Sequence, residues 1–233
     1  MATKRQYAKS HQEKLADPEH YLNQAYTFTP ELQKAILDNV PPRGRILEVG
    51  CGGGHAAAKL ASFGYNVTAV DFSSVAVSLA KKNYGQTVKF ALGDACHLNF
   101  PASYFDAVIS VELVEHLQNV DQHLKEVQKV LKPGGCYIFK TPNLIFHNLY
   151  YWRDSKIKLF HPSVMSTKEV KKLLHKHNFS VVFVKHKTLP AYQRQKLGKF
   201  TLLRPFIPFA KWFPLYLVPA YLQPSIICVA KKQ

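Results

Sequence analysis

Between residue 45 and about residue 140, the chain alternates short apolar runs with segments whose apolar residues recur at helical spacing. The apolar runs are 45–50, 65–71, 88–94, 105–111 and 136–143, and the helical segments between them include 55–64, 73–85 and 120–135. Apolar runs that alternate with helices predict βαβ units, whose parallel strands are covered on both faces. The pattern therefore predicts an α/β fold with a doubly wound, mostly parallel sheet and a ligand crevice at the carboxyl ends of its strands.

The last third of the chain continues with a helix over 166–178 and strands over 179–189 and 225–232. Between the two strands, residues 190–224 form a basic, aromatic insertion that is interrupted by several prolines. Such breaks argue against a membrane-spanning helix, which needs about 20 consecutive apolar residues. We expect this insertion to lie on a bilayer surface or to cover an apolar substrate, with an ordinary packed insertion as the alternative.

No linker separates these segments, so we expect one domain over 1–233. Its parts are an N-terminal helical cap (1–43), a cofactor-binding half (44–143) and a substrate-side half (144–233). The apolar fraction of 47% is ordinary for a globular protein. The four cysteines lack the spacing of a disulfide framework or a metal site, and the first residues lack the apolar core of a signal peptide. We therefore expect a cytoplasmic protein with free thiols.

The positive charge is concentrated in the last third of the chain. Residues 151–233 hold sixteen Lys or Arg against the acidic residues Asp154 and Glu169, which leaves +14 of the total net charge of +16. This asymmetry favours an anionic partner, such as a nucleic acid, a phosphate-bearing substrate or a membrane surface. Simple solubility is the alternative explanation.

A glycine-rich segment, "LEVGCGGG", follows the first predicted strand and opens a helix. Gly50, Gly52 and Gly54 allow the backbone to approach a nucleotide-like ligand closely. Asp71, at the end of the second strand, is placed to accept hydrogen bonds from ribose hydroxyls. These features alone also fit a nicotinamide-dependent oxidoreductase or a cofactor-binding protein without catalysis.

Further motifs distinguish this chain from an oxidoreductase and from a cofactor-binding protein without catalysis. Glu48 precedes the glycines, "GDA" at 93–95 follows the third strand, and "LKPGG" precedes the fifth. Together these residues resemble a class I S-adenosylmethionine-dependent methyltransferase, a Rossmann-like fold with seven strands, the last of which is antiparallel. The resemblance implies that S-adenosylmethionine is bound by the glycines and by the residues that match the family's motifs, namely Glu48, Asp71, Phe72, Asp94, Ala95 and Val111.

A second motif, "VELVEHL" at 111–117, places Glu112, Glu115 and His116 directly after the fourth strand. Two carboxylates and an imidazole suit Mg²⁺, Mn²⁺ or Zn²⁺, or a proton-transfer site. A plain helix start, at which the helix dipole favours acidic residues, is the alternative. With "KTPN" at 140–143, which is similar to S-T-P-N, the motif resembles the ubiquinone-biosynthesis O-methyltransferases.

The same motif also resembles the small-RNA 3′-terminal 2′-O-methyltransferases, which add a further histidine ligand, here His161. The resemblance implies a divalent metal held by Glu112, Glu115, His116 and His161, with Glu115 and His116 as catalytic residues. The favoured acceptor is a hydrophobic or lipid-like molecule, a phenol or quinone precursor methylated on oxygen. RNA is the alternative acceptor. We expect five further histidines, which belong to neither motif, to lie at the surface, namely His97, His123, His147, His175 and His177.

Overall fold

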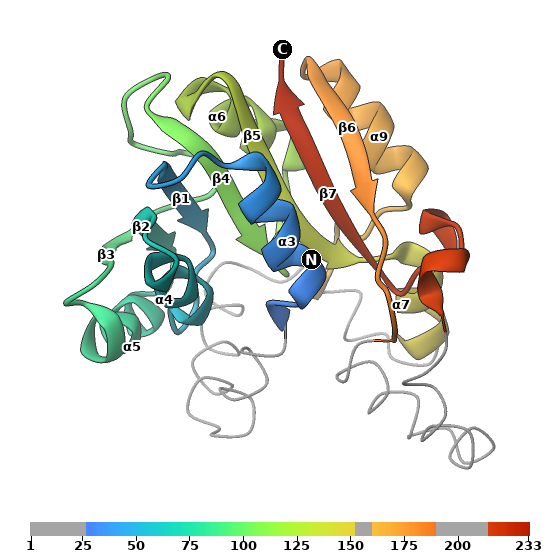
Figure 1. Ribbon diagram of the computed structural model, residues 1–233, viewed down its shortest axis with the longest axis horizontal. Coiled ribbons are helices and arrows are strands. Elements are labelled where there is room, and N and C mark those ends of the chain that lie inside the picture. Colours follow the sequence, from blue (N-terminus) through green and yellow to red (C-terminus); the bar gives the residue numbers. More distant parts are fainter. Residues whose placement is uncertain (1–26, 152–159, 190–213) are drawn as a thin grey trace.

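A computed structural model describes residues 27–151, 160–189 and 214–233 of the chain (Figure 1). Seven strands form one sheet in the order β3-β2-β1-β4-β5-β7-β6. The strands are β1 (Arg45–Val49), β2 (Asn66–Asp71), β3 (Lys89–Leu92), β4 (Phe105–Val111), β5 (Leu131–Pro142), β6 (Phe179–Val184) and β7 (Ser225–Lys232). Neighbouring strands are parallel except that β7 runs antiparallel to both β5 and β6. The predicted seven-stranded, mostly parallel sheet is confirmed.

Helices connect most of the strands, and four of the six described α-helices begin at a side-chain cap. The helices are α3 (Pro30–Asn39), α4 (His55–Ser62), α5 (Ser74–Tyr84), η1 (Val114–His116), α6 (Val120–Val130), α7 (Leu144–Tyr151), α9 (Thr167–Lys176), η3 (Leu215–Leu217) and η4 (Ala220–Leu222). Thr29, Ser73, Asn119 and Ser166 each accept a hydrogen bond from a backbone N–H in the first turn of the helix that follows. Such caps fix where a helix begins.

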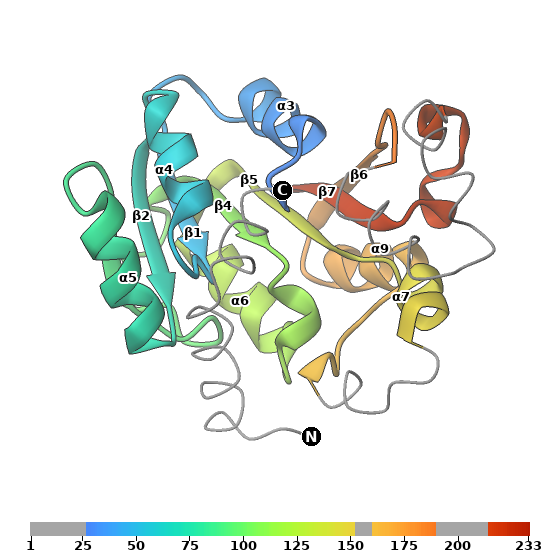
Figure 2. The ribbon, with the colours of Figure 1, turned by 90° about the horizontal axis from the view of Figure 1, so that it is seen from below.

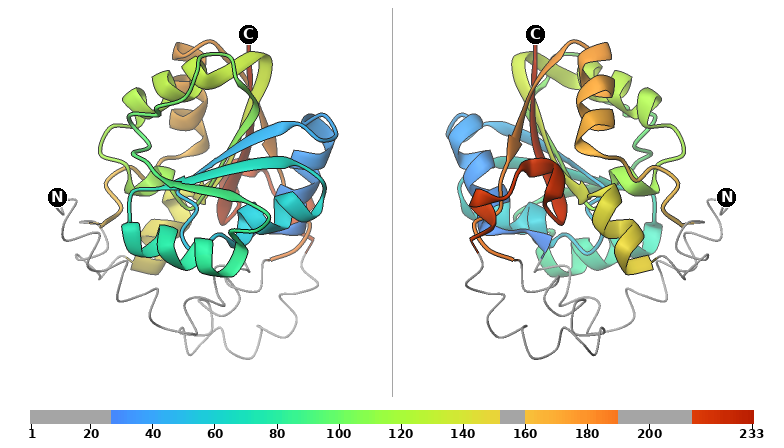
Figure 3. Two further views of the ribbon diagram at one scale, coloured as in Figure 1. Left: turned by 90° about the vertical axis from the view of Figure 1, so that its left-hand side faces the viewer. Right: turned by 90° about the vertical axis from the view of Figure 1, so that its right-hand side faces the viewer.

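Alternate residues of the strands enter two separate cores. Ile46 and Ile138 pack with α3 and α4 in one core, whereas Leu47 and Tyr137 pack with α6 and α9 in the other. Figures 2 and 3 show α3 and α9 on opposite faces of the sheet. Because both faces are covered, the strands read as unbroken apolar runs in the sequence.

Three element boundaries differ clearly from the prediction. The helix expected over 120–135 ends at Val130, and β5 already begins at Leu131. Lys132–Gly135 belongs to the strand as an irregular segment, with a register shift against β4 and a positive φ of 72° at Gly134. A proline and two glycines cannot continue a helix, but a bulged strand accommodates them. The strand expected over 179–189 ends at Val184.

Only parts of the predicted cap and insertion lie among the described residues. Helix α3 belongs to the predicted cap, whereas 1–26 lies outside the described residues. Of the insertion, 214–224 is described, and Asn143 holds it by bonding the carbonyls of Tyr221 and Gln223 at 3.0 and 2.8 Å. The division into a cap and two halves stays a prediction. In the described part of the chain, no helix is long and apolar enough to cross a membrane.

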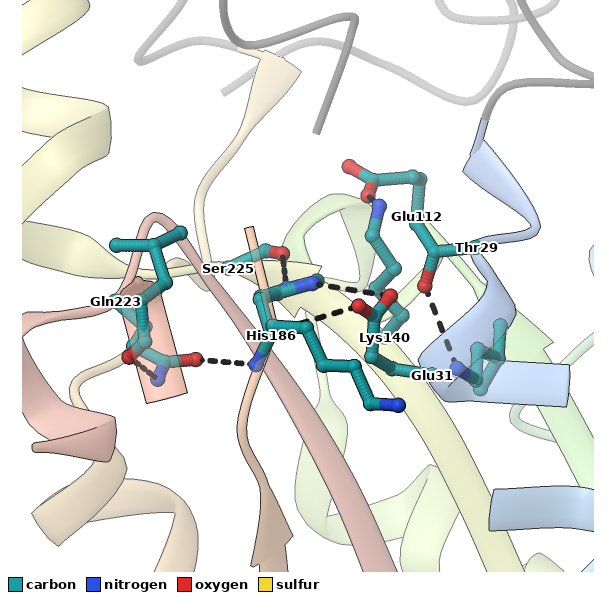
Figure 4. Close-up of polar contacts among 10 residues, drawn as sticks. Thr29, Glu31, Glu112, Lys140, His186, Gln223 and Ser225 are labelled. Carbon is teal, nitrogen blue, oxygen red and sulfur yellow. Dashed lines mark hydrogen bonds and ion pairs between the residues drawn. The ribbon is translucent and has the colours of Figure 1, made fainter. Parts of the chain in front are cut away.

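A buried polar cluster joins α3 to the ends of β6 and β7 (Figure 4). His186 is fully buried, its Nε2 lies 2.8 Å from Ser225 Oγ, and its Nδ1 lies 3.7 Å from a Glu31 carboxylate oxygen. Gln223 accepts a hydrogen bond from the His186 backbone N–H at 2.7 Å. Partial burial acts to raise the pKa of Glu31, but the His186 side chain and the Lys187 N–H outweigh it and lower this pKa to about 2.

We expect Glu31→Gln to lower the free energy of unfolding at pH 7 by about 1.5 kcal/mol, because a hydrogen-bonded charge is lost. The folded pKa of about 2 lies below the ordinary value of 4.5, so this stabilisation is complete above pH 4.5 and is lost as the pH falls towards 2. Urea unfolding from pH 7 to pH 3 should show the two proteins converging. Asp38→Asn, which breaks an exposed ion pair on the same helix, is the control and should cost about 0.3–0.5 kcal/mol. A constant difference at all pH values would contradict the role of Glu31.

Candidate active site

The glycine-rich turn lies between β1 and α4, at the carboxyl end of β1. Gly50 and Gly54 have φ angles of 77° and 84°, which side chains rarely adopt. A Cβ at Gly50 would meet Leu113 at 2.8 Å, and one at Gly54 would meet Phe90 at 2.8 Å. Glycine is therefore required at both positions by the backbone angle and by the close packing beneath the turn.

Asp71 holds this turn from the end of β2. One carboxylate oxygen accepts a hydrogen bond from the Gly52 N–H at 2.9 Å, and the other accepts one from the Ser73 N–H at 2.9 Å. The residue is 4% exposed, so these bonds form in a shielded environment. The predicted ribose ligand thus also shapes the turn that would hold the rest of the cofactor.

Glu48 supplies a buried carboxyl group beneath the same turn. It is 2% exposed, and burial, with a smaller contribution from the charge of Asp71, raises its pKa to about 8. Its Oε2 has no hydrogen-bond partner in the described structure. A buried carboxyl oxygen without a partner suits a cationic ligand. The sulfonium and ammonium groups of S-adenosylmethionine provide such a ligand, so the residues present fit this cofactor.

The remaining predicted cofactor residues lie along the same edge of the sheet. The Asp94 carboxylate accepts a hydrogen bond from the Cys96 N–H at 2.9 Å, which closes the turn after β3. Ala95 is buried behind this turn, Val111 is half-buried at the end of β4, and Phe72 is 36% exposed after β2. The structure thus brings the glycines, Asp71 and Asp94 to neighbouring strand ends, and their contact with a cofactor stays a prediction.

A buried chain of hydrogen bonds supports the turn after β3. His123 on α6 places Nδ1 2.8 Å from the Ala95 carbonyl and Nε2 3.0 Å from the Tyr137 hydroxyl, which lies 2.7 Å from Ser110 Oγ. Burial lowers the pKa of His123 to about 4, so the ring is neutral at pH 7. A neutral ring that donates from Nδ1 accepts at Nε2, which gives every polar atom of this chain a partner.

Three of the five histidines expected at the surface are buried, which corrects that prediction. His123 is fully buried, and His147 and His177 are 5% and 7% exposed, whereas His97 and His175 are exposed as expected. Each of the three lies on the inner side of its element, where a ring can pack and still bond a polar neighbour. The helical period could have revealed His123, because it lies on the buried face of α6 with Leu124, Val127 and Val130.

The E-x-x-E-H motif, residues 112–116, follows β4 directly and forms a second cluster of polar side chains, which we call the E-x-x-E-H corner. Glu112 has a φ of 52°, and its carboxylate pairs with the ammonium group of Lys140 on β5 (Figure 4). Glu115 is 1% exposed and accepts a hydrogen bond from the Thr141 hydroxyl at 2.9 Å. Burial, and then the charge of Glu112, raise the pKa of Glu115 well above its usual range. Glu115 therefore takes up a proton more readily than an exposed glutamate does.

His116 extends this corner towards the segment at 160–163. Its Nδ1 lies 2.8 Å from the Phe160 carbonyl, and its ring centroid lies 4.6 Å from that of His161. His161 Nδ1 in turn lies 2.9 Å from Nε2 of His147 on α7. The structure thus brings His161 to His116, as the sequence predicted, and adds His147, which the sequence analysis missed.

The arrangement of these side chains does not fit the expected divalent metal. Within 27–151, 160–189 and 214–233, no group of three or more His, Cys, Asp or Glu side chains is placed to hold a metal ion. The Glu112 carboxylate is engaged by the ammonium of Lys140, Thr141 bonds Glu115, and His161 bonds His147. We therefore derive no chemical step through a metal at this corner.

Residues 47–139 match the family described as "Methyltransferase domain", in agreement with the fold and the glycine-rich turn. The chain is 30% identical over 139 residues to the ubiquinone biosynthesis O-methyltransferase of Coxiella burnetii, an alignment that covers 58% of this chain and 59% of that protein. It is 40% identical over 105 residues to the 2-methyl-6-phytyl-1,4-hydroquinone methyltransferase of Synechocystis, covering 44% and 33% of the two chains. The chain spans about half the length of the curated relatives it matches, or less.

Among solved structures, a SAM-dependent methyltransferase from Methanosarcina mazei superposes with a TM-score of 0.63 at 20% identity. The superposition covers 85% of this chain and 96% of that one, and it shows that the two folds are the same. These similarities, together with the domain match, favour a methyltransferase over the oxidoreductase alternative.

We expect Gly54→Ala to weaken the binding of S-adenosylhomocysteine at least tenfold, because the added Cβ would displace Phe90 and shift the turn. Gly64→Ala is the matched control, since Gly64 has a similar φ of 86° but no atom within 4 Å of the added Cβ. The control should cost only about 1–2 kcal/mol of stability for the left-handed backbone and leave ligand affinity unchanged. Titration calorimetry measures both affinities, and equal affinities would contradict the assigned role of the turn.

Proposed function

We propose that this protein transfers a methyl group from S-adenosylmethionine to a hydroxyl group of a hydrophobic small molecule, such as a phenol or quinone precursor. The observation that supports it most directly is the position of the E-x-x-E-H corner next to the glycine-rich turn. Leu113, the residue after Glu112, packs against Gly50. The names of the two curated relatives, which act on quinone or hydroquinone intermediates, support this class of acceptor.

Methyl transfer to an oxygen needs alignment of donor and acceptor and a base for the hydroxyl proton. The acceptor oxygen forms a bond to the methyl carbon, and the electrons of the carbon–sulfur bond return to sulfur, which leaves S-adenosylhomocysteine. His116 suits the base, because Nδ1 donates to the Phe160 carbonyl and Nε2 then carries the lone pair. Glu115 is buried and is held in the corner by the Thr141 hydroxyl, so we assign it a positioning role rather than that of the base.

RNA remains a second candidate acceptor on the strength of one observation, the net charge of +14 over residues 151–233. A labelled methyl group from S-adenosylmethionine, followed through a cell extract, separates the two candidates. We expect label in the organic-soluble fraction. Label confined to the RNA fraction would favour the second candidate, and label in neither fraction would contradict methyl transfer to both classes.

We expect His116→Gln to lower the rate of methyl transfer by a factor of about 10²–10⁴, which is typical for the loss of a general base. The affinity for S-adenosylhomocysteine should stay unchanged, because the glycines, Asp71 and Asp94 lie at the ends of other strands. His175→Gln, an exposed histidine on α9, is the control and should keep full activity. Single-turnover rates of the three proteins test this assignment, and an unchanged rate in His116→Gln would sink it.

We propose further that a surface formed by α7 and the described end of the insertion contacts an anionic membrane. Large apolar side chains are exposed on α7, η3 and η4, namely Ile145, Leu149, Tyr216, Leu217, Tyr221 and Leu222. Figures 1 and 3 show α7 next to the segment that carries η3 and η4. Exposed aromatic and aliphatic side chains in a strongly basic part of a chain suit the interface of an anionic bilayer.

We expect the double variant Leu217→Asp, Leu222→Asp to bind vesicles of phosphatidylcholine and phosphatidylserine at least tenfold more weakly than the parent, because apolar insertion is lost and charge repulsion is added. Val182→Asp is the matched control, since Val182 on β6 is 64% exposed against 68% for Leu217. Vesicle sedimentation measures the binding. Equal loss in both variants, or no loss in either, would contradict this membrane surface.

A further inference from the structure

Lys140 is a buried cation in the middle of the sheet. It lies on β5, where it pairs in register with Val111 of β4 and Ile227 of β7, and its side chain is 5% exposed. An ammonium group is strongly disfavoured in such a place unless an opposite charge compensates it. Glu112 provides that charge, so the lysine and the first carboxylate of the E-x-x-E-H motif depend on each other.

The backbone of Glu112 is shaped to make this pair. Its φ of 52° lies in the left-handed region, which residues other than glycine enter at a cost. In this conformation the Glu112 N–H donates to the Lys140 carbonyl at 2.8 Å, while the two side chains form the ion pair. Strained residues that the surroundings hold in place are concentrated at functional sites.

Thr141, the next residue of β5, forms a hydrogen bond with Glu115, the second carboxylate of the motif. The Thr141 hydroxyl donates to Glu115 Oε2 at 2.9 Å, and Glu115 is 1% exposed. Two successive strand residues thus supply a cation to Glu112 and a hydrogen bond to Glu115. The protein itself provides the positive charge at a corner where the sequence motif suggested a metal ion.

We propose that the ammonium group of Lys140 takes the place of a divalent cation at this corner, so that the reaction of this protein needs no added metal. The proposal rests on the proposed methyl transfer to a hydroxyl group. Lys140 is a positioning residue, which holds Glu112 in place and compensates its charge while the hydroxyl proton passes to His116. Lys140 takes no part in the proton transfer, so the balance of the transfer step is unchanged.

If Lys140 takes the place of a divalent cation, its removal should create a metal-binding site. Lys140→Ser changes "KTPN" to "STPN", removes the ammonium and leaves Glu112 and Glu115 side by side without a cation. Two carboxylates in such proximity favour a divalent cation. We therefore expect Lys140→Ser to gain a Mn²⁺ site that the natural chain lacks, and Lys140→Arg, which keeps the charge, not to gain one.

The first measurement is the binding of Mn²⁺ by electron paramagnetic resonance. We expect Lys140→Ser to bind one Mn²⁺ at least tenfold more tightly than the parent and to lose this site when Glu112→Gln is added. Lys132→Ser is the matched control, because Lys132 forms a similar ion pair with Asp106 at the other end of β5. The control should bind Mn²⁺ as the parent does. Binding of S-adenosylhomocysteine verifies that each variant is folded.

The second measurement is methyl transfer with EDTA and with added Mg²⁺ or Mn²⁺. The parent should keep its full rate in EDTA, whereas Lys140→Ser should lose at least tenfold in EDTA and regain rate with metal. Tight Mn²⁺ binding by the parent that Glu112→Gln abolishes would overturn the proposal. This comparison decides the question even where Lys140→Ser does not fold. The Mn²⁺ measurement also stands without any acceptor, so failure of the proposed reaction and failure of the Lys140 proposal are distinguishable.

Discussion

Burial of the sheet on both faces is the constraint on which the rest of this structure depends. Because alternate residues of β1, β4, β5 and β7 enter the two cores, few positions within the strands remain for polar chemistry. The carboxylates of Asp71, Asp94 and Glu112 lie at or just after strand ends. Lys140 lies within a strand, where its burial is tolerated because Glu112 compensates its charge.

The site consists of two strained turns at neighbouring strand ends, one after β1 and one after β4. The turn after β1 combines positive φ angles with close packing against Phe90 and Leu113, which leaves room only for the backbone and a ligand. The turn after β4 reverses the chain at Glu112 and directs its carboxylate onto β5. Leu113 contacts the first turn and belongs to the second, so the geometry of one restrains that of the other.

The sequence allowed most of the fold and the cofactor turn to be predicted, because their signals are local. Apolar periodicity marked each strand, and the glycines and Asp71 lie within one βαβ unit. The partners of the second corner depend on which strands become neighbours, and no local pattern shows that Lys140 meets Glu112. The burial of His147 was missed for the same reason, since its partner His161 arrives from a separate segment. The end of α6 at Val130 was misjudged because proline and two glycines also suit a bulged strand.

Hydrogen bonds fix the chain at both ends of the insertion. We call these bonds the clamps, and they make the stability of the sheet largely independent of the sequence between them. His186 and Ser225 bond each other where β6 ends and β7 begins, and Asn143 fixes the chain just before β7. With both ends held, a change in the length of the intervening chain alters mainly the entropy of loop closure, by about 0.6 kcal/mol for each doubling. The segment between the clamps is thus an exchangeable part. Evolution or design can therefore vary its length while the sheet stays as it is.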